Sequence, residues 1–383
     1  MGILDEILDK VVGEEITIGN LVGANIIVAQ GGRVIYENSF GFADREQQKQ
    51  MTPETIIRLA SLTKPLVTAA AMALLESGII KLDDQVTKWL SYFVPKNPDG
   101  TVTPIQLRHL LNHTSGLGYG FLSADNEPYK SAGVSDGLDD SGLSLEENLR
   151  RLASVPLLFK PGTSWCYSLS TDVLGAVMEK ACQKPLSEIV EEHVTGPLKM
   201  SDTTFLVKDV DRLAVAYADK SADDEAPRRM EAEDRVLLDG CGPIHYAPGR
   251  IMNPRAYPSG GAGMAGTARD YLKFLETIRQ GGVAILKKKS VSLMTEDLVP
   301  DFEVPAAGPG FGFGMGFAVV RDSEMANTAK SRGTYEWGGV YGAKMYVDPE
   351  RELSVVILTN TALYGLMHFP TIIEKTLYGG RLG

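Results

Sequence analysis

The eleven residues from Pro65 to Leu75 carry no charge, and no other stretch constrains the fold as strongly. A proline near the start of this run and Gly78 just beyond its end are typical of a helix. A helix without a polar face is buried on nearly all sides. The sequence therefore predicts a helix in the interior of the protein.

Ser61 and Lys64 stand directly before this run, in the only Ser-x-x-Lys of the sequence. Side chains three positions apart lie on one face of a helix. A serine hydroxyl is a weak nucleophile at neutral pH, and a lysine amine that loses its charge in a dry pocket can take the proton. Because burying an unpaired ammonium is costly, Lys64 is paired, functional, or extended to solvent along its stem. Two interpretations stay open: a nucleophile with its base, or an N-cap serine beside a solvent-reaching lysine.

The size and charge of the chain restrict its partners. It has 383 residues, 44% apolar and 23% charged, which is ordinary for a globular protein with two lobes or two domains. The net charge of −11 and the pI near 5.1 argue against nucleic acid or an anionic membrane surface as a partner. These values favour a small neutral substrate.

Cysteine usage and the first residues indicate the compartment. Cys166, Cys182 and Cys241 are odd in number and widely spaced, so they predict neither a disulfide framework nor a zinc ribbon. The first ten residues read as an acidic amphipathic helix and not as a signal peptide. No uncharged apolar run reaches the roughly 18 residues that a membrane span needs. We therefore expect a cytoplasmic protein without a membrane partner.

Strand patterns occur near both ends of the chain, and helical patterns dominate between about residues 54 and 300. Gly31-Gly32 predicts a hairpin between its two flanking strands. The expected strands are Asn25–Gln30, Arg33–Phe40, Phe311–Arg321, Gly333–Asp348 and Leu353–Asn360, followed by a helix over Thr361–Leu377. In the middle of the chain, Thr103 to Gln106 reads as a capping-box helix start.

This order of elements predicts an α/β fold with one antiparallel sheet built from both chain ends, flanked by helices, against a mostly helical second lobe. We expect residues 1–55 plus 305–383 to form the sheet domain. Residues 56–304 would form the helical lobe, with the site in the cleft between the two.

Three short motifs point elsewhere and lack the context that they need. Ser135 lies in a Gly-x-Ser-x-Gly pattern, but the apolar strand that should precede a nucleophile elbow is missing. The run from Gly261 to Gly266 matches a dinucleotide fingerprint, but two prolines stand where the strand should be. His109 and His113 have the spacing of metal ligands, without a third ligand. We expect loops and packing at all three, with no metal and no cofactor.

Two further segments carry candidate chemistry. Tyr167 follows a turn and Trp165, directly before a predicted helix over Thr171–Gln183, and it is either a packing residue or an acid/base. Trp337-Gly338-Gly339 begins a late strand, and paired glycines permit a close approach of the backbone to a ligand.

Taken in order, these motifs resemble the serine β-lactamase/transpeptidase-like superfamily, and within it the class C β-lactamases and the family VIII carboxylesterases. Ser61-Leu62-Thr63-Lys64 matches the Ser-x-x-Lys nucleophile motif. Tyr167-Ser168-Leu169 stands in the place of Tyr-x-Asn, and Trp337-Gly338-Gly339 in the place of Lys-Thr-Gly. Flanking segments agree, among them Leu110 to Leu117 and Gly260 to Gly266, so the resemblance covers roughly residues 20–360.

The resemblance implies a role for each matched residue. Ser61 would be the nucleophile, with Lys64 and Tyr167 sharing its proton. The backbone N–H groups of Ser61 and Val340 would form the oxyanion hole. The substrate would be bound by Trp337, Gly338, Gly339, Leu169 and Trp165.

Two departures from the family pattern bear on the substrate. Trp337 replaces a lysine that holds a substrate carboxylate, and offers only an N–H donor. Leu169 replaces an asparagine that would bond a substrate amide. Both changes favour a carboxylesterase for neutral short-to-medium acyl esters. A class C-like β-lactamase or D,D-peptidase, an acyltransferase and a non-catalytic binding protein remain as alternatives, and neither the natural ester nor the oligomeric state follows from the sequence.

Overall fold

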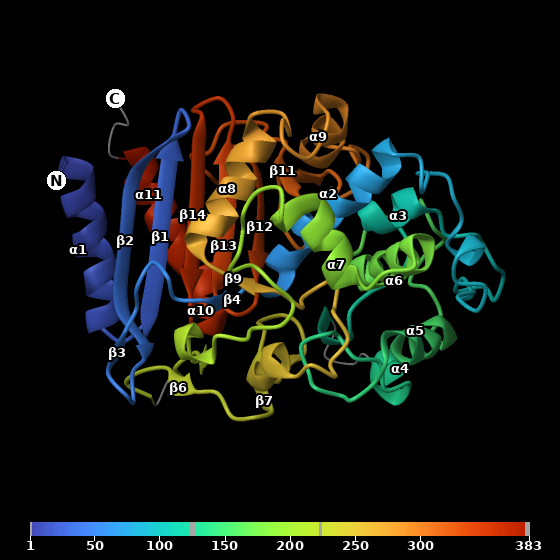
Figure 1. The fold of residues 1–383 in the computed structure, drawn as a ribbon, viewed down its shortest axis with the longest axis horizontal. Coiled ribbons are helices and arrows are strands. Elements are labelled where there is room, and N and C mark those ends of the chain that lie inside the picture. Colours follow the sequence, from blue (N-terminus) through green and yellow to red (C-terminus); the bar gives the residue numbers. More distant parts are fainter. Residues whose placement is uncertain (1, 123–126, 222–223, 380–383) are drawn as a thin grey trace.

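A computed structural model describes residues 2–122, 127–221 and 224–379. Its main feature is an eight-stranded sheet in the order β10-β11-β12-β13-β14-β1-β2-β3, antiparallel at every pairing (Figure 1). The strands are β1 (Gly23–Gln30), β2 (Arg33–Asp44), β3 (Lys49–Gln50), β10 (Phe311–Phe313), β11 (Ala318–Val320), β12 (Tyr335–Gly339), β13 (Ala343–Asp348) and β14 (Leu353–Thr359). The sheet thus combines both ends of the chain, which confirms the predicted fold class.

The two ends meet where β1 pairs with β14. Ile26 lies opposite Ile357 and Val28 opposite Val355, so β-branched side chains from distant parts of the chain pack side by side. On its other edge β1 continues into β2 through Gly31 and Gly32, both with positive φ. The predicted hairpin is therefore confirmed, and the reason for the glycines is the left-handed backbone of the turn.

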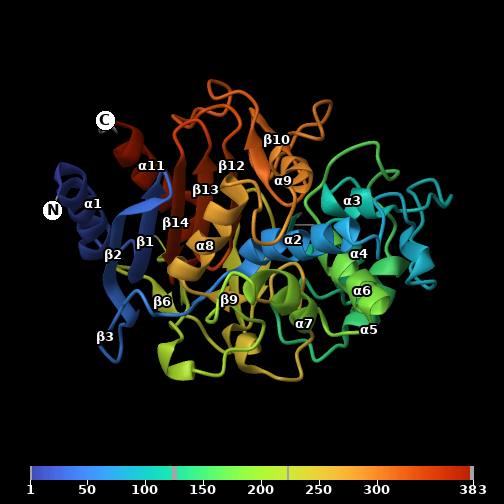
Figure 2. The same ribbon diagram turned by 45° about the horizontal axis from the view of Figure 1, so that its top comes forward.

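Helices cover both faces of the sheet. α1 (Ile3–Thr17) and α11 (Phe369–Gly379) lie on one face, and α8 (Ala268–Arg279) crosses the other (Figures 1 and 2). The first face is closed by a separate apolar cluster that includes Leu8, Val28, Tyr346, Phe369 and Ile373. The second face belongs to the large core that continues into the helical lobe.

The helical lobe is built around α2 (Thr63–Glu76), which is the helix predicted from the uncharged run. Its side chains from Thr63 to Met72 are all buried, and it contacts α6 and α7. Gly78, with φ of 75°, follows its C-terminus. The other helices of the lobe are α3 (Leu107–Leu111), α4 (Glu127–Ser131), α5 (Leu145–Ser154), α6 (Ser170–Cys182), α7 (Leu186–Val190) and α9 (Lys288–Thr295).

Three small two-stranded sheets lie among the described residues of the chain between β3 and β10. They pair β4 (Ile57–Arg58) with β9 (Ala265–Gly266), β5 (Tyr217–Ala218) with β6 (Arg228–Arg229), and β7 (Asp234–Leu237) with β8 (Pro243–Tyr246). The first of these sheets joins the chain just before Ser61 to the loop that precedes α8. The division into residues 1–55 plus 305–383 and 56–304 stays a prediction, and α8, from the second segment, packs on β1 and β14.

Several predicted elements are divided more finely in the structure. The strand expected over Phe311–Arg321 is the hairpin of β10 and β11, and the one over Gly333–Asp348 is the hairpin of β12 and β13. Gly316 and Gly342 have positive φ in the two turns, which apolar periodicity does not reveal. The closing helix is divided into α10 (Ala362–Met367) and α11 at His368.

The predicted helix start at Thr103 is wrong. The Thr103 hydroxyl accepts a hydrogen bond from the Asn97 side chain, and the Ile105 carbonyl accepts one from the Val86 amide. These tertiary bonds hold residues 103–105 outside the helix, and α3 begins only after Gln106. Among the described residues, no helix is both long and apolar enough to cross a membrane.

Candidate active site

Ser61 lies in a single 3₁₀ turn, Ala60–Leu62, that leads directly into α2. Ala60 has φ of 43°, in the left-handed region that residues with a Cβ rarely adopt. Such strain persists where the surrounding structure enforces it, and it is common at functional sites. The turn places the Ser61 side chain half-buried at the wall of a large pocket.

Lys64 lies three residues further on, inside α2, and is 1% exposed. Its Nζ donates to Ser61 Oγ at 3.3 Å, to the Tyr119 hydroxyl at 2.8 Å and to the Gly261 carbonyl at 2.8 Å. The interpretation of Lys64 as a solvent-reaching lysine is therefore wrong. Burial lowers the pKa of Lys64 to about 7, against the opposing negative charges of Asp172 and Asp136. An amine with this pKa is about half neutral at pH 7 and can accept a proton.

Tyr167 approaches Ser61 from the other side, from the segment just before α6. Its hydroxyl donates to Ser61 Oγ at 2.6 Å, and Lys64 Nζ lies 4.5 Å from the centre of its ring. Burial raises the pKa of Tyr167 well above its ordinary value. The hydroxyl is thus protonated at neutral pH and acts first as a hydrogen-bond donor. The structure brings together Ser61, Lys64 and Tyr167, as the sequence predicts.

Two further groups contact Lys64 that the sequence did not predict: the Tyr119 hydroxyl and the Gly261 carbonyl. Tyr119 holds Lys64 through its hydroxyl, and its ring stacks on Phe121 at 4.8 Å. The Gly261 carbonyl comes from the loop that matches the dinucleotide fingerprint. Tyr119 stands between two glycines, directly after the matched segment Leu110 to Leu117. That position was the only available signal, since nothing local indicates which side chain or carbonyl reaches Lys64.

Gly339, at the end of β12, explains how the sheet approaches the nucleophile. A Cβ on Gly339 would lie 2.1 Å from the Leu59 carbonyl oxygen, so only glycine lets β12 pack against the backbone before Ser61. Val340 follows in the turn to β13, and its carbonyl accepts a hydrogen bond from the Tyr246 hydroxyl at 2.9 Å. Gly339 thus serves contact between two backbone segments, and Val340, the next residue, lines the pocket that also exposes Ser61.

The pocket has a volume of about 840 Å³ and a mostly apolar lining. Ser61, Tyr167, Trp337, Gly338 and Val340 line one part of it, together with Phe121 and Leu122. It continues along β12 and β13 to Leu366 and Met367 of α10. A volume of this order accommodates a small organic substrate.

The predicted substrate-binding residues occupy different layers of this wall. Trp337 lines the pocket, with its ring 5.1 Å from that of Tyr167, and its buried Nε1 has no hydrogen bond of good geometry among the described residues. Trp165 packs behind it against Phe313 at 5.3 Å. Leu169 is fully buried below the site. Gly339, Trp165 and Leu169 are not among the residues that line the pocket, so they support the site from behind.

Two of the alternative motifs, around Ser135 and around His109 and His113, make hydrogen bonds that explain them as structural elements. Ser135 is 1% exposed in the loop between α4 and α5, where its hydroxyl bonds the Asp139 carboxylate. His113 bonds Ser168 Oγ at 2.9 Å, and His109 Nδ1 accepts from the Gln106 amide. Within the described ranges, no group of three or more His, Cys, Asp or Glu is placed to hold a metal.

An antiparallel sheet built from both chain ends, with a half-buried serine, a buried lysine and a tyrosine in contact at the helical lobe, is the arrangement of a serine hydrolase of the β-lactamase type. The family model for beta-lactamase matches residues 8–367. The chain belongs to this family.

Relatives and solved structures agree with that membership. Esterase EstB from Burkholderia gladioli is 43% identical, over 95% of this chain and 91% of its own. The structure of EstCE1, described as a hydrolase with promiscuous acyltransferase activity, superposes with a TM-score of 0.94 at 43% identity and covers 98% of both chains. Simvastatin synthase from Aspergillus terreus, at 21% identity and a TM-score of 0.79, shares the fold.

Proposed function

We propose that this protein is a carboxylesterase of the family VIII type that hydrolyses neutral esters of short to medium acyl chains through an acyl-Ser61 intermediate. The observation that carries the proposal is the convergence of Lys64 Nζ and the Tyr167 hydroxyl on Ser61 Oγ at the wall of an apolar pocket. The esterase relative at 43% identity supports the same reaction.

In the first half of the reaction, neutral Lys64 accepts the Ser61 proton through their 3.3 Å contact, and Ser61 Oγ attacks the ester carbonyl. The tetrahedral oxyanion is stabilised by the backbone N–H groups of Ser61 and Val340. When the C–O bond of the alcohol breaks, the leaving alkoxide takes a proton from the Lys64–Tyr167 pair. A water molecule then attacks acyl-Ser61 by the same route in reverse, which releases the acid and restores the serine.

The direct test is a hydrolysis panel on the wild-type protein. Nitrophenyl acetate, butyrate and a long-chain ester measure the esterase activity and its acyl preference, and a chromogenic cephalosporin measures β-lactamase activity. We expect the highest kcat/KM on the acetate or the butyrate. Efficient turnover of the cephalosporin with weak activity on all three esters would contradict the proposal.

Acyl transfer to an alcohol is the second candidate activity. EstCE1, at a TM-score of 0.94, is described as having promiscuous acyltransferase activity, and the pocket here is large and mostly apolar. Such a lining favours an organic alcohol over water as the second substrate. Adding a primary alcohol to the nitrophenyl butyrate assay distinguishes the two fates of the acyl enzyme, because transfer yields butyrate ester and hydrolysis yields free acid.

Trp337 sets the preference for neutral substrates in this proposal. An ammonium at this position would bond a substrate carboxylate, and its absence removes about 1.5–3 kcal/mol, or one to two decades in kcat/KM. We therefore expect Trp337→Lys to shift the ratio of kcat/KM for the cephalosporin over nitrophenyl butyrate upwards by about tenfold or more. The loss of ring contacts with Tyr167 and Phe313 lowers the activity on both substrates, so the ratio is the quantity to measure. An unchanged ratio would remove Trp337 as the specificity residue.

The burial of Lys64 predicts the pH dependence. Its pKa is lowered to about 7, and only the neutral amine accepts the Ser61 proton. Below pH 7 the amine becomes protonated, so kcat/KM for nitrophenyl butyrate should fall about tenfold per pH unit, while above pH 7 it should reach a plateau. The measurement is a pH profile between about 5 and 9. An acid limb that ends near pH 4, where an ordinary carboxylate titrates, would assign the base role to another group.

A further inference from the structure

Asp172 is a buried carboxylate with no part in the reaction as described above. It lies in the first turn of α6, five residues after Tyr167, and is fully buried. Its Oδ1 accepts a hydrogen bond from the Ser259 hydroxyl at 2.6 Å, and its Oδ2 has no partner of good geometry among the described residues. Lys64 and Arg250 are cations that act on this carboxylate. A carboxyl group buried in this way requires a reason.

The partner of Asp172 belongs to the loop that holds Lys64. Ser259 begins a tight turn, in which its Oγ accepts from the Ala262 amide at 3.1 Å and its carbonyl accepts from the Gly263 amide at 2.9 Å. Gly261 lies at the centre of this turn and directs its carbonyl to Lys64 Nζ. The Asp172–Ser259 bond therefore fixes the segment that carries one of the three acceptors of Lys64.

The turn packs closely against its neighbours. A Cβ on Gly261 would lie 2.4 Å from Asp172 Oδ2 and 2.8 Å from the Tyr119 hydroxyl. A Cβ on Gly260 would lie 2.5 Å from the Thr171 carbonyl oxygen. The turn is thus seated on the start of α6 and against Tyr119, and its glycines permit that contact.

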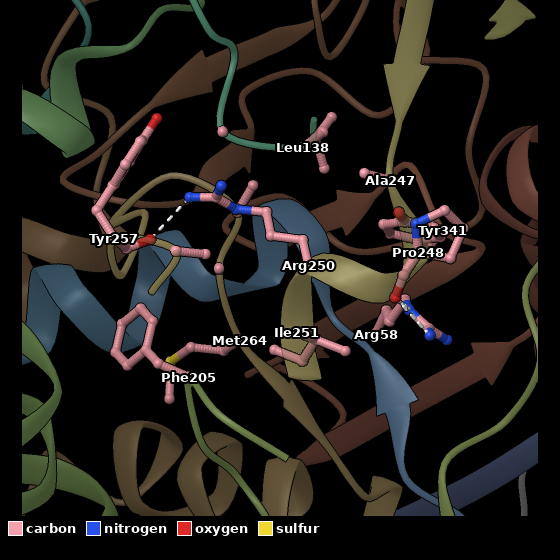
Figure 3. Close-up of a pocket in the computed structure, with 14 residues that line it drawn as sticks. Arg58, Leu138, Phe205, Ala247, Pro248, Arg250, Ile251, Tyr257, Met264 and Tyr341 are labelled. Carbon is pink, nitrogen blue, oxygen red and sulfur yellow. Dashed lines mark hydrogen bonds between the residues drawn. The ribbon is translucent and has the colours of Figure 1, made fainter. Parts of the chain in front are cut away.

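The opposite side of the turn is anchored by an arginine. Arg250 Nη2 donates to the Tyr257 carbonyl at 2.7 Å, and Figure 3 shows its side chain extended across a small cavity towards Tyr257. The cavity has a volume of only about 30 Å³, which suits a water molecule and no substrate. Arg250 and Asp172 therefore hold the loop at Tyr257 and Ser259, two residues apart.

We infer that Asp172 is a positioning residue for Lys64: through Ser259 it fixes the Gly261 carbonyl on Lys64, and its carboxylate supplies a negative charge that acts on the lysine. The inference rests on the proposed function of Ser61 and Lys64. It gives Gly261, the first residue of the run that matches a dinucleotide fingerprint, a role in acyl transfer instead.

The charges around Lys64 determine what removal of Asp172 should do. Lys64 is faced by Asp172 from α6, by Asp136 from the loop before α5, by Tyr119 and Tyr167, and by His113, whose own pKa is lowered by burial and by Lys64. Of the two carboxylates, Asp172 opposes the effect of burial on the Lys64 pKa more strongly. Burial raises the pKa of Asp136 to about 7, so Asp136 is largely neutral on the acid limb.

Asp172 has its own charged and titratable neighbours. Burial raises its pKa, whereas the Ser259 hydroxyl, Lys64, the Gly261 amide and Arg250 lower it. Tyr119, Tyr167 and Tyr257 also lie close enough for Asp172 to raise their pKa values. Because a nearby anion stabilises an ammonium, loss of the Asp172 charge lowers the pKa of Lys64 and extends its neutral form to lower pH.

The experiment follows the rate at which a fluorophosphonate labels Ser61, as a function of pH, in the full-length protein. Asp172→Asn removes the charge and keeps the shape, and it should move the acid limb of the labelling rate to lower pH by about one unit. Ser259→Ala keeps the carboxylate and breaks the link to the turn. It should lower the plateau rate by about tenfold while moving the limb less than Asp172→Asn does.

The matched control is Asp139→Asn, because the Asp139 carboxylate bonds Ser135 and is not among the charges that act on Lys64. This variant should keep both the limb and the plateau. Thermal melting of each variant separates a loss of fold from a loss of positioning, and Ser259→Ala carries the test if Asp172→Asn does not fold.

Two results would overturn the inference: an acid limb in Asp172→Asn that coincides with that of Asp139→Asn, or a wild-type plateau in Ser259→Ala. A wild-type protein whose Ser61 takes no label would instead contradict the proposed function, so the two failures are distinguishable.

Discussion

Replacing Ser61 with alanine should abolish ester hydrolysis, with a loss of at least about 10⁴-fold in kcat, because the acyl enzyme forms on the Ser61 hydroxyl. Lys64 Nζ and the Tyr167 hydroxyl converge on Ser61 Oγ. The measurement is kcat on nitrophenyl butyrate together with mass spectrometry after fluorophosphonate treatment, which should find the label on the peptide that contains Ser61.

Ser135→Ala is the matched control for this prediction. Ser135 is a buried serine in a motif that also suggests a nucleophile, but its hydroxyl bonds the Asp139 carboxylate and lies outside the lining of the pocket. We expect this variant to retain most of the wild-type kcat and all of the labelling. A label on Ser135, or full activity in Ser61→Ala, would contradict the assignment of the nucleophile.

Lys64→Ala and Tyr167→Phe should each lower kcat by about 10²–10⁴-fold, the usual contribution of a positioned acid or base. Lys64 is held within 3.3 Å of Ser61 Oγ and Tyr167 within 2.6 Å, so either change removes a group that moves the same proton. KM should change less than kcat, since neither group is needed to fill the pocket.

The double variant distinguishes a shared proton from two independent effects. If both residues act on one proton, Lys64→Ala combined with Tyr167→Phe should lose far less than the product of the two single losses. Tyr257→Phe is a suitable control, because this buried tyrosine contacts Asn148 and Ser135 instead of the nucleophile. Near-wild-type kcat in Tyr167→Phe would make Tyr167 a packing residue beside Trp337, and a strictly multiplicative double variant would rule out the common proton.

The effect of Lys64→Ala on the free energy of unfolding can also be predicted. The pKa of Lys64 in the folded protein, about 7, lies below its unfolded value of 10.5. Between these two values the unfolded chain binds the proton that the folded chain has released, so the burial of Lys64 penalises folding most below pH 7. We therefore expect Lys64→Ala to lose activity without a matching decrease in the free energy of unfolding. Such a trade-off is usual where catalytic groups destabilise the fold.

The sequence determined the parts of this protein that depend on neighbours in the chain. The buried helix α2 follows from an uncharged run between a proline and a glycine, and the Ser61–Lys64 contact follows from a spacing of three residues. The β1–β2 hairpin follows from two glycines that permit a left-handed turn. Tyr167 is 106 residues from Ser61, so no spacing rule connects them, and only the resemblance to a known family indicated their contact.

Tertiary structure alone decided the surroundings that give those residues their chemistry. Tyr119 and the Gly261 carbonyl are 55 and 197 residues from Lys64, and they reach it only in the folded protein, in which α6 packs against α2. The approach of Gly339 to the Leu59 carbonyl likewise exists only once the sheet and the helical lobe are in contact. The physical reason is that a local pattern specifies which groups are present, whereas burial and long-range contact specify their pKa values and their partners.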